Sequence, residues 1–208
     1  MVYLIHSGDN ILKINDILKV AQKRFGLYGL EKTTMKEIAA DLNMSKASLY
    51  YYFPDKEHLF KAVIETEQTE FFRLVESTFE TISDPADMLR TFVSIRLRYF
   101  KTFFNLSRLR HEELKSMKPL LGDIFNQLRS HEIEVVEQIL AKGVESKQFQ
   151  IINTVEVATL FLETIKGLRS QVLYNKELMY VEPDEYTVLE KKLNMFTDIF
   201  IRGLSANN

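Results

Sequence analysis

The chain has 208 residues, 46% of them hydrophobic, and its four prolines and seven glycines are few enough to favour an ordered, helical protein over a disordered one. Cysteine is absent, which excludes disulfides, cysteine–zinc sites and thiol catalysis. The formal net charge is -2. Residues 1–64 contain nine basic and seven acidic residues, and the remainder contains eighteen basic and twenty-two acidic residues. A positive N-terminal segment and a negative remainder are expected of a nucleic-acid-binding head on an acidic body.

The N-terminal segment predicts neither secretion nor a membrane anchor. Its first residues are mostly apolar, but the run is too short and too weakly charged for a signal peptide. No run in the chain approaches the ~18 apolar residues of a membrane-spanning helix. We therefore expect a cytoplasmic protein without a membrane partner. The first predicted helix covers about 11–28, where apolar residues recur at helical spacing, and it ends near Gly26 and Gly29.

The segment 34–53 predicts two short helices joined by a tight turn. Thr33 or Thr34 can cap the first helix, because a hydroxyl accepts a hydrogen bond from an otherwise unpaired backbone N–H. Asn43 lies at the turn and tolerates the left-handed backbone that such turns often need. Ser45 can cap the second helix. This pattern indicates a helix-turn-helix, whose usual partner is the DNA major groove.

The second helix of this motif is predicted to display polar and aromatic side chains to solvent. Leu49 and Phe53, four residues apart, form its buried stripe. The side chains that then point outward are those of Ala47, Ser48, Tyr50 and Tyr51. A helix that buries two side chains and displays small, hydroxyl and aromatic groups is suited to contact another molecule.

Six more helices are predicted after the motif, and prolines mark the starts of most of them. They cover about 55–82, 85–104, 106–116, 120–146, 155–178 and 183–203. Pro54, Pro85, Pro119 and Pro183 lie at or just before predicted helix starts, where proline is tolerated. No strand-like alternation, internal repeat or low-complexity tract is present. We expect an all-α fold of about nine helices.

The pattern from Asn15 to Phe60 resembles the DNA-binding domain of the TetR/AcrR family of bacterial transcriptional regulators. The matching positions are Ile17-Leu18-x-x-Ala21-x-x-x-Phe25-x-x-x-Gly29, Thr33-Thr34-x-x-x-Ile38-Ala39 and Ser45-x-x-x-Leu49-Tyr50-Tyr51-Tyr52-Phe53-Pro54-x-Lys56-x-x-Leu59. The match covers about a quarter of the chain, and the remainder is similar to the family only in helix number and length. The resemblance implies a helix-turn-helix domain over 11–56 and an effector-binding and dimerisation domain over 57–208.

The resemblance also implies a set of DNA-binding residues in the head. Base contacts are expected from Lys46, Ala47 and Tyr50, and phosphate contacts from Thr34, Ser48, Tyr51, Tyr52 and Lys56, with Ser45 at the start of the same helix. Two positions depart from the family, which commonly has glycine at Asn43 and Ala47. The methyl group of Ala47 can contact a thymine methyl or hold the helix off the groove. Tyr52 is equally well explained as part of the core, and an isolated lysine such as Lys56 as a solvated charge.

Two polar residues interrupt apolar helix faces in the body, namely Arg96 and His131. A buried arginine is costly unless it is paired, so Arg96 either reaches solvent, meets a carboxylate such as Glu163, or awaits an anionic ligand. The candidate effector pocket consists of Arg96, Tyr99, Phe103, Phe104, His131 and Phe161. Pockets of this kind are apolar, contain few polar groups and lie between bundle helices.

The last two predicted helices are apolar on more than one face, so each must be buried on both sides. Pairing with a second copy as a four-helix bundle would bury them, as the family resemblance implies, and the alternative is burial within one subunit. The expected dimer interface contains Phe161, Leu168, Val172, Leu189, Phe196 and Phe200.

Catalysis finds no support in the sequence. The four histidines are not placed at metal-ligand spacing, and His111-Glu112-Glu113 lacks the second histidine of a zincin-type helix. Glycine-rich phosphate loops are absent as well. We expect no enzyme activity, no metal and no cofactor.

The sequence thus predicts a ligand-responsive homodimeric transcriptional repressor. Its two heads would enter successive major grooves of a palindromic double-stranded DNA operator, and a small-molecule effector would tilt the helix over 55–82 and release the DNA. The alternatives are an activator, a ligand-independent architectural DNA-binding protein, and a helical module that binds protein.

Overall fold

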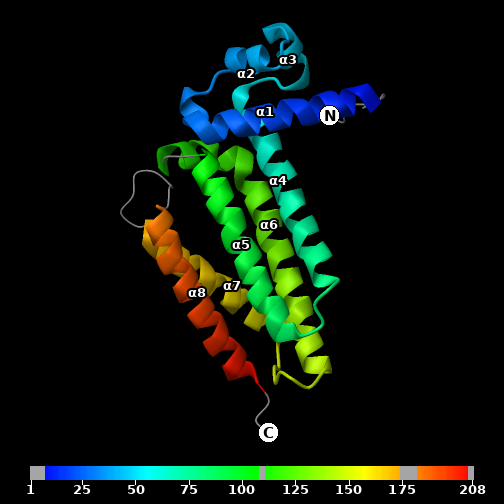
Figure 1. Ribbon diagram of the computed structural model, residues 1–208, viewed down its shortest axis with the longest axis vertical. Coiled ribbons are helices and arrows are strands. Elements are labelled where there is room, and N and C mark those ends of the chain that lie inside the picture. Colours follow the sequence, from blue (N-terminus) through cyan, green and yellow to red (C-terminus); the bar gives the residue numbers. More distant parts are fainter. Residues whose placement is uncertain (1–7, 108–110, 174–181, 206–208) are drawn as a thin grey trace.

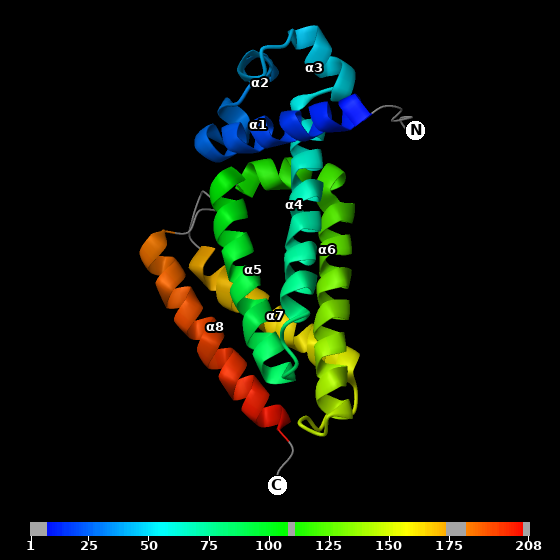
Figure 2. The same ribbon diagram turned by 45° about the vertical axis from the view of Figure 1, so that its right-hand side comes forward.

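The computed structural model describes residues 8–107, 111–173 and 182–205, and these residues form a helical head on a helical body (Figure 1). The helices are α1 (Gly8–Lys32), α2 (Met35–Asp41), α3 (Lys46–Tyr52), α4 (Lys56–Phe79), α5 (Pro85–Ser107), α6 (His111–Glu145), α7 (Thr154–Leu173) and α8 (Pro183–Leu204). The all-α prediction is confirmed. In both views α1 lies across one end of the body, with α2 and α3 on its far side (Figures 1 and 2).

The described residues form eight helices, whereas the sequence predicted nine, and the difference lies around Pro119. Residues 106 and 107 of the predicted short helix over 106–116 belong to α5, and its residues from His111 onward belong to α6. The expected break before Pro119 is wrong, since α6 continues through it. A proline removes one backbone donor and bends a helix without necessarily ending it. Met117 and Leu121, on either side, are both buried against the head.

Two apolar cores are joined by α4. The head core contains Ile17 and Phe25 of α1, Leu49 of α3, and Phe60 from the first turns of α4. The body core contains residues of α4 to α8 and begins at Phe71 on α4. Because one straight helix contributes to both cores, a tilt of its body half also moves its head half. Within the described ranges, no helix is long and apolar enough to cross a lipid bilayer.

Candidate functional site

The helix-turn-helix is set by side-chain caps at both of its helices. Thr34 accepts a hydrogen bond from the Glu37 N–H at 3.3 Å, and the Glu37 carboxylate accepts one from the Thr34 N–H at 2.9 Å, which is a capping box. At the turn Asn43 has φ 50°. Ser45 accepts from the Ser48 N–H at 3.0 Å and so caps α3. The predictions of a threonine cap, a left-handed Asn43 and a serine cap are confirmed.

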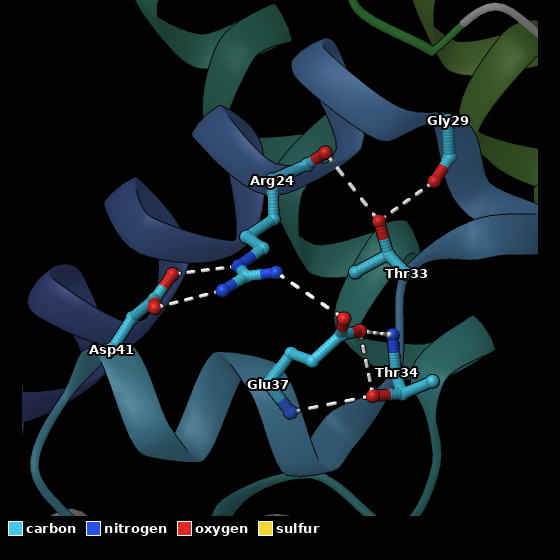
Figure 3. A network of polar contacts seen from close by, with 6 residues as sticks. All are labelled: Arg24, Gly29, Thr33, Thr34, Glu37 and Asp41. Carbon is cyan, nitrogen blue, oxygen red and sulfur yellow. Dashed lines mark hydrogen bonds and ion pairs between the residues drawn. The ribbon is translucent and has the colours of Figure 1, made fainter.

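A polar clamp holds α2 against α1 (Figure 3). Arg24 of α1 donates two hydrogen bonds to the Asp41 carboxylate, at 2.6 and 2.8 Å, and lies 3.5 Å from the Glu37 carboxylate. The hydrogen bond from Arg24 lowers the pKa of Asp41 below its usual range. Thr33 is buried and donates to the carbonyl of Gly29 at 2.7 Å, at the point where α1 is interrupted with φ 80°. The clamp fixes the direction in which α3 projects.

Replacing Thr33 with valine should lower the free energy of unfolding by about 1–3 kcal/mol, because the near-isosteric side chain leaves a buried carbonyl without its donor. The matched control is Thr187→Val on α8. It removes an exposed hydroxyl that donates to the backbone carbonyl of Pro183 at 3.3 Å. That change should cost less than about 0.5 kcal/mol. Urea unfolding followed by circular dichroism measures both, and equal losses in the two variants would contradict the assignment.

The surface of α3 that faces away from the core is exposed and rich in hydroxyl groups. Tyr51 is 77% exposed and Tyr50 41%, while Leu49 is fully buried. Lys46 lies 5.4 Å from the centroid of the Tyr50 ring. The four side chains expected outward on this helix are all exposed, and Ser45 and Lys46 are exposed as well; the four are Ala47, Ser48, Tyr50 and Tyr51. This arrangement offers hydrogen-bond donors, aromatic edges and one cation on a single protruding helix.

Two of the predicted DNA-binding residues are also tied into the head. Tyr52 is half-buried, and its hydroxyl donates to Asn10 at 3.4 Å. The ammonium of Lys56 donates to the backbone carbonyls of Leu30 at 2.8 Å and Glu31 at 3.3 Å. Lys56 therefore joins the start of α4 to the end of α1, where a cation also complements the helix dipole. Contact of these two residues with DNA stays a prediction.

A cavity of about 500 Å³ lies between α4, α5, α6 and α7 and reaches α1. Gln22 and Phe25 of α1 line it. The aromatic part of the lining consists of Phe25, Phe60, Tyr99, Phe100 and Phe125. Its polar part includes Gln22, Glu67, Gln68, Arg96, Glu132 and Arg169, with Arg129, Glu163 and Lys166.

Only part of the predicted effector pocket lines this cavity. Arg96 and Tyr99 do. His131 instead stacks on Phe72, with ring centroids 3.7 Å apart, and is absent from the lining. Phe161 is fully buried in the body core, where its ring packs against those of Phe196 and Phe200, so it too is absent from the lining. The side chains of Phe103 and Phe104 lie outside the described residues.

Arg96 closes a buried ion pair across the α5–α6 contact. Its guanidinium donates to both carboxylate oxygens of Glu132, one of them at 3.2 Å, and both residues are buried. The suggested partner Glu163 is wrong, because that residue pairs with Arg129 near the surface at 2.8 Å. The sequence placed a costly charge on α5 correctly but could not say which helix lay opposite. Arg96 therefore already has a carboxylate partner before any ligand binds.

Glu67 is a second buried charge, which the sequence analysis missed. It lies on α4, is 7% exposed, and accepts a hydrogen bond from the amide of Gln22. Burial raises its pKa to about 8, and the nearby Glu70 acts in the same direction. The available signal was the same as for Arg96, since Glu67 interrupts an apolar face between Ile64 and Phe71.

The exposed apolar face of α7 and α8 differs from the predicted one. Phe161 and Leu189 are buried inside the chain, and Leu168, Val172, Phe196 and Phe200 are half-buried against the same core. The large apolar side chains that reach solvent on these helices are Val155, Leu160, Val188, Met195 and Ile199. The face open to a partner is therefore rotated from the predicted one, because the larger aromatic residues fill the body core.

Comparison with known proteins places the chain in a family. The family model described as "Bacterial regulatory proteins, tetR family" matches residues 17–63. The crystal structure of a transcriptional regulator from Cytophaga hutchinsonii is 36% identical, with a TM-score of 0.86, over 93% of this chain and 99% of that one. The chain belongs to the TetR family of transcriptional regulators. The resemblance of its head to that family is thereby confirmed.

Two further proteins are similar to this TetR-family regulator. The uncharacterized HTH-type transcriptional regulator YfiR of Bacillus subtilis is 27% identical over 78% of this chain and 80% of its own length. A regulator from Saccharomonospora viridis, solved in complex with choline, is 19% identical with a TM-score of 0.74, over 95% of this chain and 100% of that one. The second similarity shows a shared fold. As a member of the family, the protein is a DNA-binding transcriptional regulator.

Proposed function

We propose that this TetR-family regulator is a homodimeric repressor that binds a palindromic operator through α3 and is released by a small molecule in the body cavity. The observation that carries the proposal is the position of the cavity. Its lining joins Gln22 and Phe25 of α1 to four body helices, so a ligand there touches the head directly. The Saccharomonospora regulator that was solved with choline supports a small molecule as the effector.

The release mechanism follows from the two roles of α4. Phe60, Val63 and Ile64 line the cavity and at the same time belong to the head core. A ligand that prefers a different tilt of α4 therefore favours a different head position. The effector needs only a higher affinity for the state that does not fit the operator. A cavity at the junction of head and body favours a ligand-responsive regulator over a ligand-independent architectural protein.

Dimerisation is expected through the exposed apolar face of α7 and α8. Val188, Met195 and Ile199 lie on one side of α8, and Leu160 is exposed on α7. An exposed apolar face of this kind typically marks an interface. A twofold dimer would present two copies of α3 to successive major grooves, about one helical turn apart.

Lys46→Ala and Tyr50→Ala should each weaken operator binding by about 1–3 kcal/mol, and Tyr50→Ala should also relax sequence preference. The operator comes from selection out of random duplexes, and fluorescence anisotropy measures affinity. The control is Lys142→Ala, an exposed lysine in the last turn of α6, remote from the head (Figure 1). Unchanged affinity in both head variants would refute the interface. Failure to select any duplex at low salt would favour a protein-binding module instead.

A further inference from the structure

We propose that the cavity accepts an amphipathic organic cation, whose charge pairs with the Glu67 carboxylate and whose apolar part lies against the aromatic wall. This inference rests on the proposed function, since it names the chemical class of the effector. It also assigns Glu67 as the group through which the ligand acts on the head.

The carboxyl group of Glu67 is buried without a cationic partner among the described side chains. The side chain is 7% exposed, and its recorded hydrogen bond comes from the neutral amide of Gln22. No salt bridge joins it to any side chain that the structure describes, and Glu70 adds like charge nearby. A buried carboxylate without a cation is costly, and an opposite charge within reach relieves that cost.

The three arginines of the cavity already have negative or aromatic partners, and its remaining cation, Lys166, is exposed to solvent. Arg96 is paired with Glu132, and Arg129 with Glu163. The guanidinium of Arg169 stacks over the Phe100 ring at 3.9 Å and lies in the field of Glu132. An anionic ligand would therefore compete with existing interactions, whereas a cation would complete one that is missing.

The walls of the cavity are rich in aromatic side chains. Five aromatic rings line the cavity, among them Phe25 of α1, Phe60 of α4 and Tyr99 of α5, and the charge of Glu67 contributes to raising the pKa of Tyr99. Aromatic faces attract organic cations, most strongly where water is excluded. The volume of about 500 Å³ lies within the range of small-molecule sites. A ligand with an aryl or alkyl part and one quaternary nitrogen matches both the walls and the charge.

The contact with Gln22 explains how such a ligand would reach the DNA-binding head. Gln22 belongs to α1, and its hydrogen bond to Glu67 on α4 spans the junction of head and body. A cation at the carboxylate competes with the Gln22 amide and weakens this link. Binding of the cation then changes how α1 packs on α4. Because α2 and α3 belong to the same head as α1, they move with it.

The test uses three probes that share one aryl–propyl frame: phenylpropyltrimethylammonium, phenylbutyrate and phenylbutyramide. Isothermal titration of the full chain without DNA should show binding of the cation, at least about tenfold weaker binding of the cation to Glu67→Gln, and no such loss for the neutral amide. Glu67→Gln keeps the size and hydrogen-bonding capacity of the side chain, and thermal melts verify that it folds. Glu67→Asp should recover part of the cation affinity.

A pH series sharpens the test, because the quaternary nitrogen does not titrate. Cation affinity should rise between about pH 6.5 and 8.5, as Glu67 with its pKa of about 8 loses its proton. Burial keeps the pKa of Tyr99 well above this window, whereas burial and the nearby Arg96 lower that of Arg169 to about 9, so the same pH series on Glu67→Gln separates the two groups. The charged groups on the other cavity helices are Glu70 on α4, Arg96 on α5, Arg129 and Glu132 on α6, and Glu163, Lys166 and Arg169 on α7.

Coupling to the head is tested by Gln22→Leu, which removes the amide that competes with the cation at Glu67. Cation affinity should rise in this variant, and cation binding should release less operator DNA than in the wild type. Absence of cation binding to the wild type, equal binding to Glu67→Gln, or preference for phenylbutyrate would each overturn the inference. If phenylbutyrate or the amide binds in the cavity and releases the operator, the proposed function stands and the cationic assignment fails. If the cation binds through Glu67 but operator affinity never changes, the cation site stands and the repressor mechanism fails.

Discussion

Replacing Arg96 with methionine should lower the free energy of unfolding by about 3 kcal/mol, because it leaves the buried carboxylate of Glu132 without its main partner. Both side chains are 7% exposed, so water replaces the lost hydrogen bonds only poorly. The neighbouring Arg169 attracts the same carboxylate, which keeps the expected loss at the lower end of the range for broken buried pairs. Urea unfolding measures the change.

The matched control is Arg90→Met, which breaks two exposed ion pairs, to Asp87 and to Asp198, each at 3.0 Å. Exposed pairs contribute little, and the loss should stay below about 1 kcal/mol. The double variant Arg96→Met/Glu132→Leu removes both buried charges and should recover most of the stability. An equal loss of unfolding free energy in Arg90→Met and Arg96→Met would show that the buried ion pair contributes no more to stability than the exposed ones.

Met195→Asp combined with Ile199→Asp should yield a monomer and weaken operator binding by about 100-fold or more, because the two heads no longer act at a shared high effective concentration. The two side chains are 65% and 62% exposed in the single chain, so the substitutions do not disturb its core. Buried in a dimer, the new carboxylates would be uncompensated charges. Analytical ultracentrifugation gives the oligomeric state.

Asn194→Asp is the control for this pair of substitutions. Asn194 is exposed and lies one turn before Asp198, on the side of α8 that meets Arg90 of α5. A carboxylate there adds charge to the same helix outside the apolar face and should leave the dimer intact. A monomeric wild type at micromolar concentration, or a dimeric double variant, would contradict the proposed interface.

The head could be predicted from the sequence because its structure is decided locally. Thr34, Asn43 and Ser45 each act within three residues of their own position, so short-range patterns identify the caps and the turn. Lys56 shows the limit of this approach. Its backbone partners are Leu30 and Glu31, which are distant in sequence, and no local pattern indicates them.

The body was predicted less well, because its polar residues depend on what lies opposite. Arg96 and His131 interrupt apolar stripes in the same way, yet one closes an ion pair and the other stacks on Phe72. The pattern of α8 showed that two faces are apolar but not which of them the body core takes. Phe196 and Phe200 pack on Phe161, and the smaller Val188 and the flexible Met195 are left outside.

The central claim is that two copies of α3 read one operator from the same side of the duplex, and half-site spacing tests it most directly. Fluorescence anisotropy compares the selected palindrome with a duplex that carries about five extra base pairs, half a helical turn, between its half-sites. A duplex with one half-site is the reference. We predict that the insertion lowers affinity to the level of the single half-site. Undiminished affinity for the lengthened duplex would show that the heads bind independently and would contradict a dimer with fixed head separation.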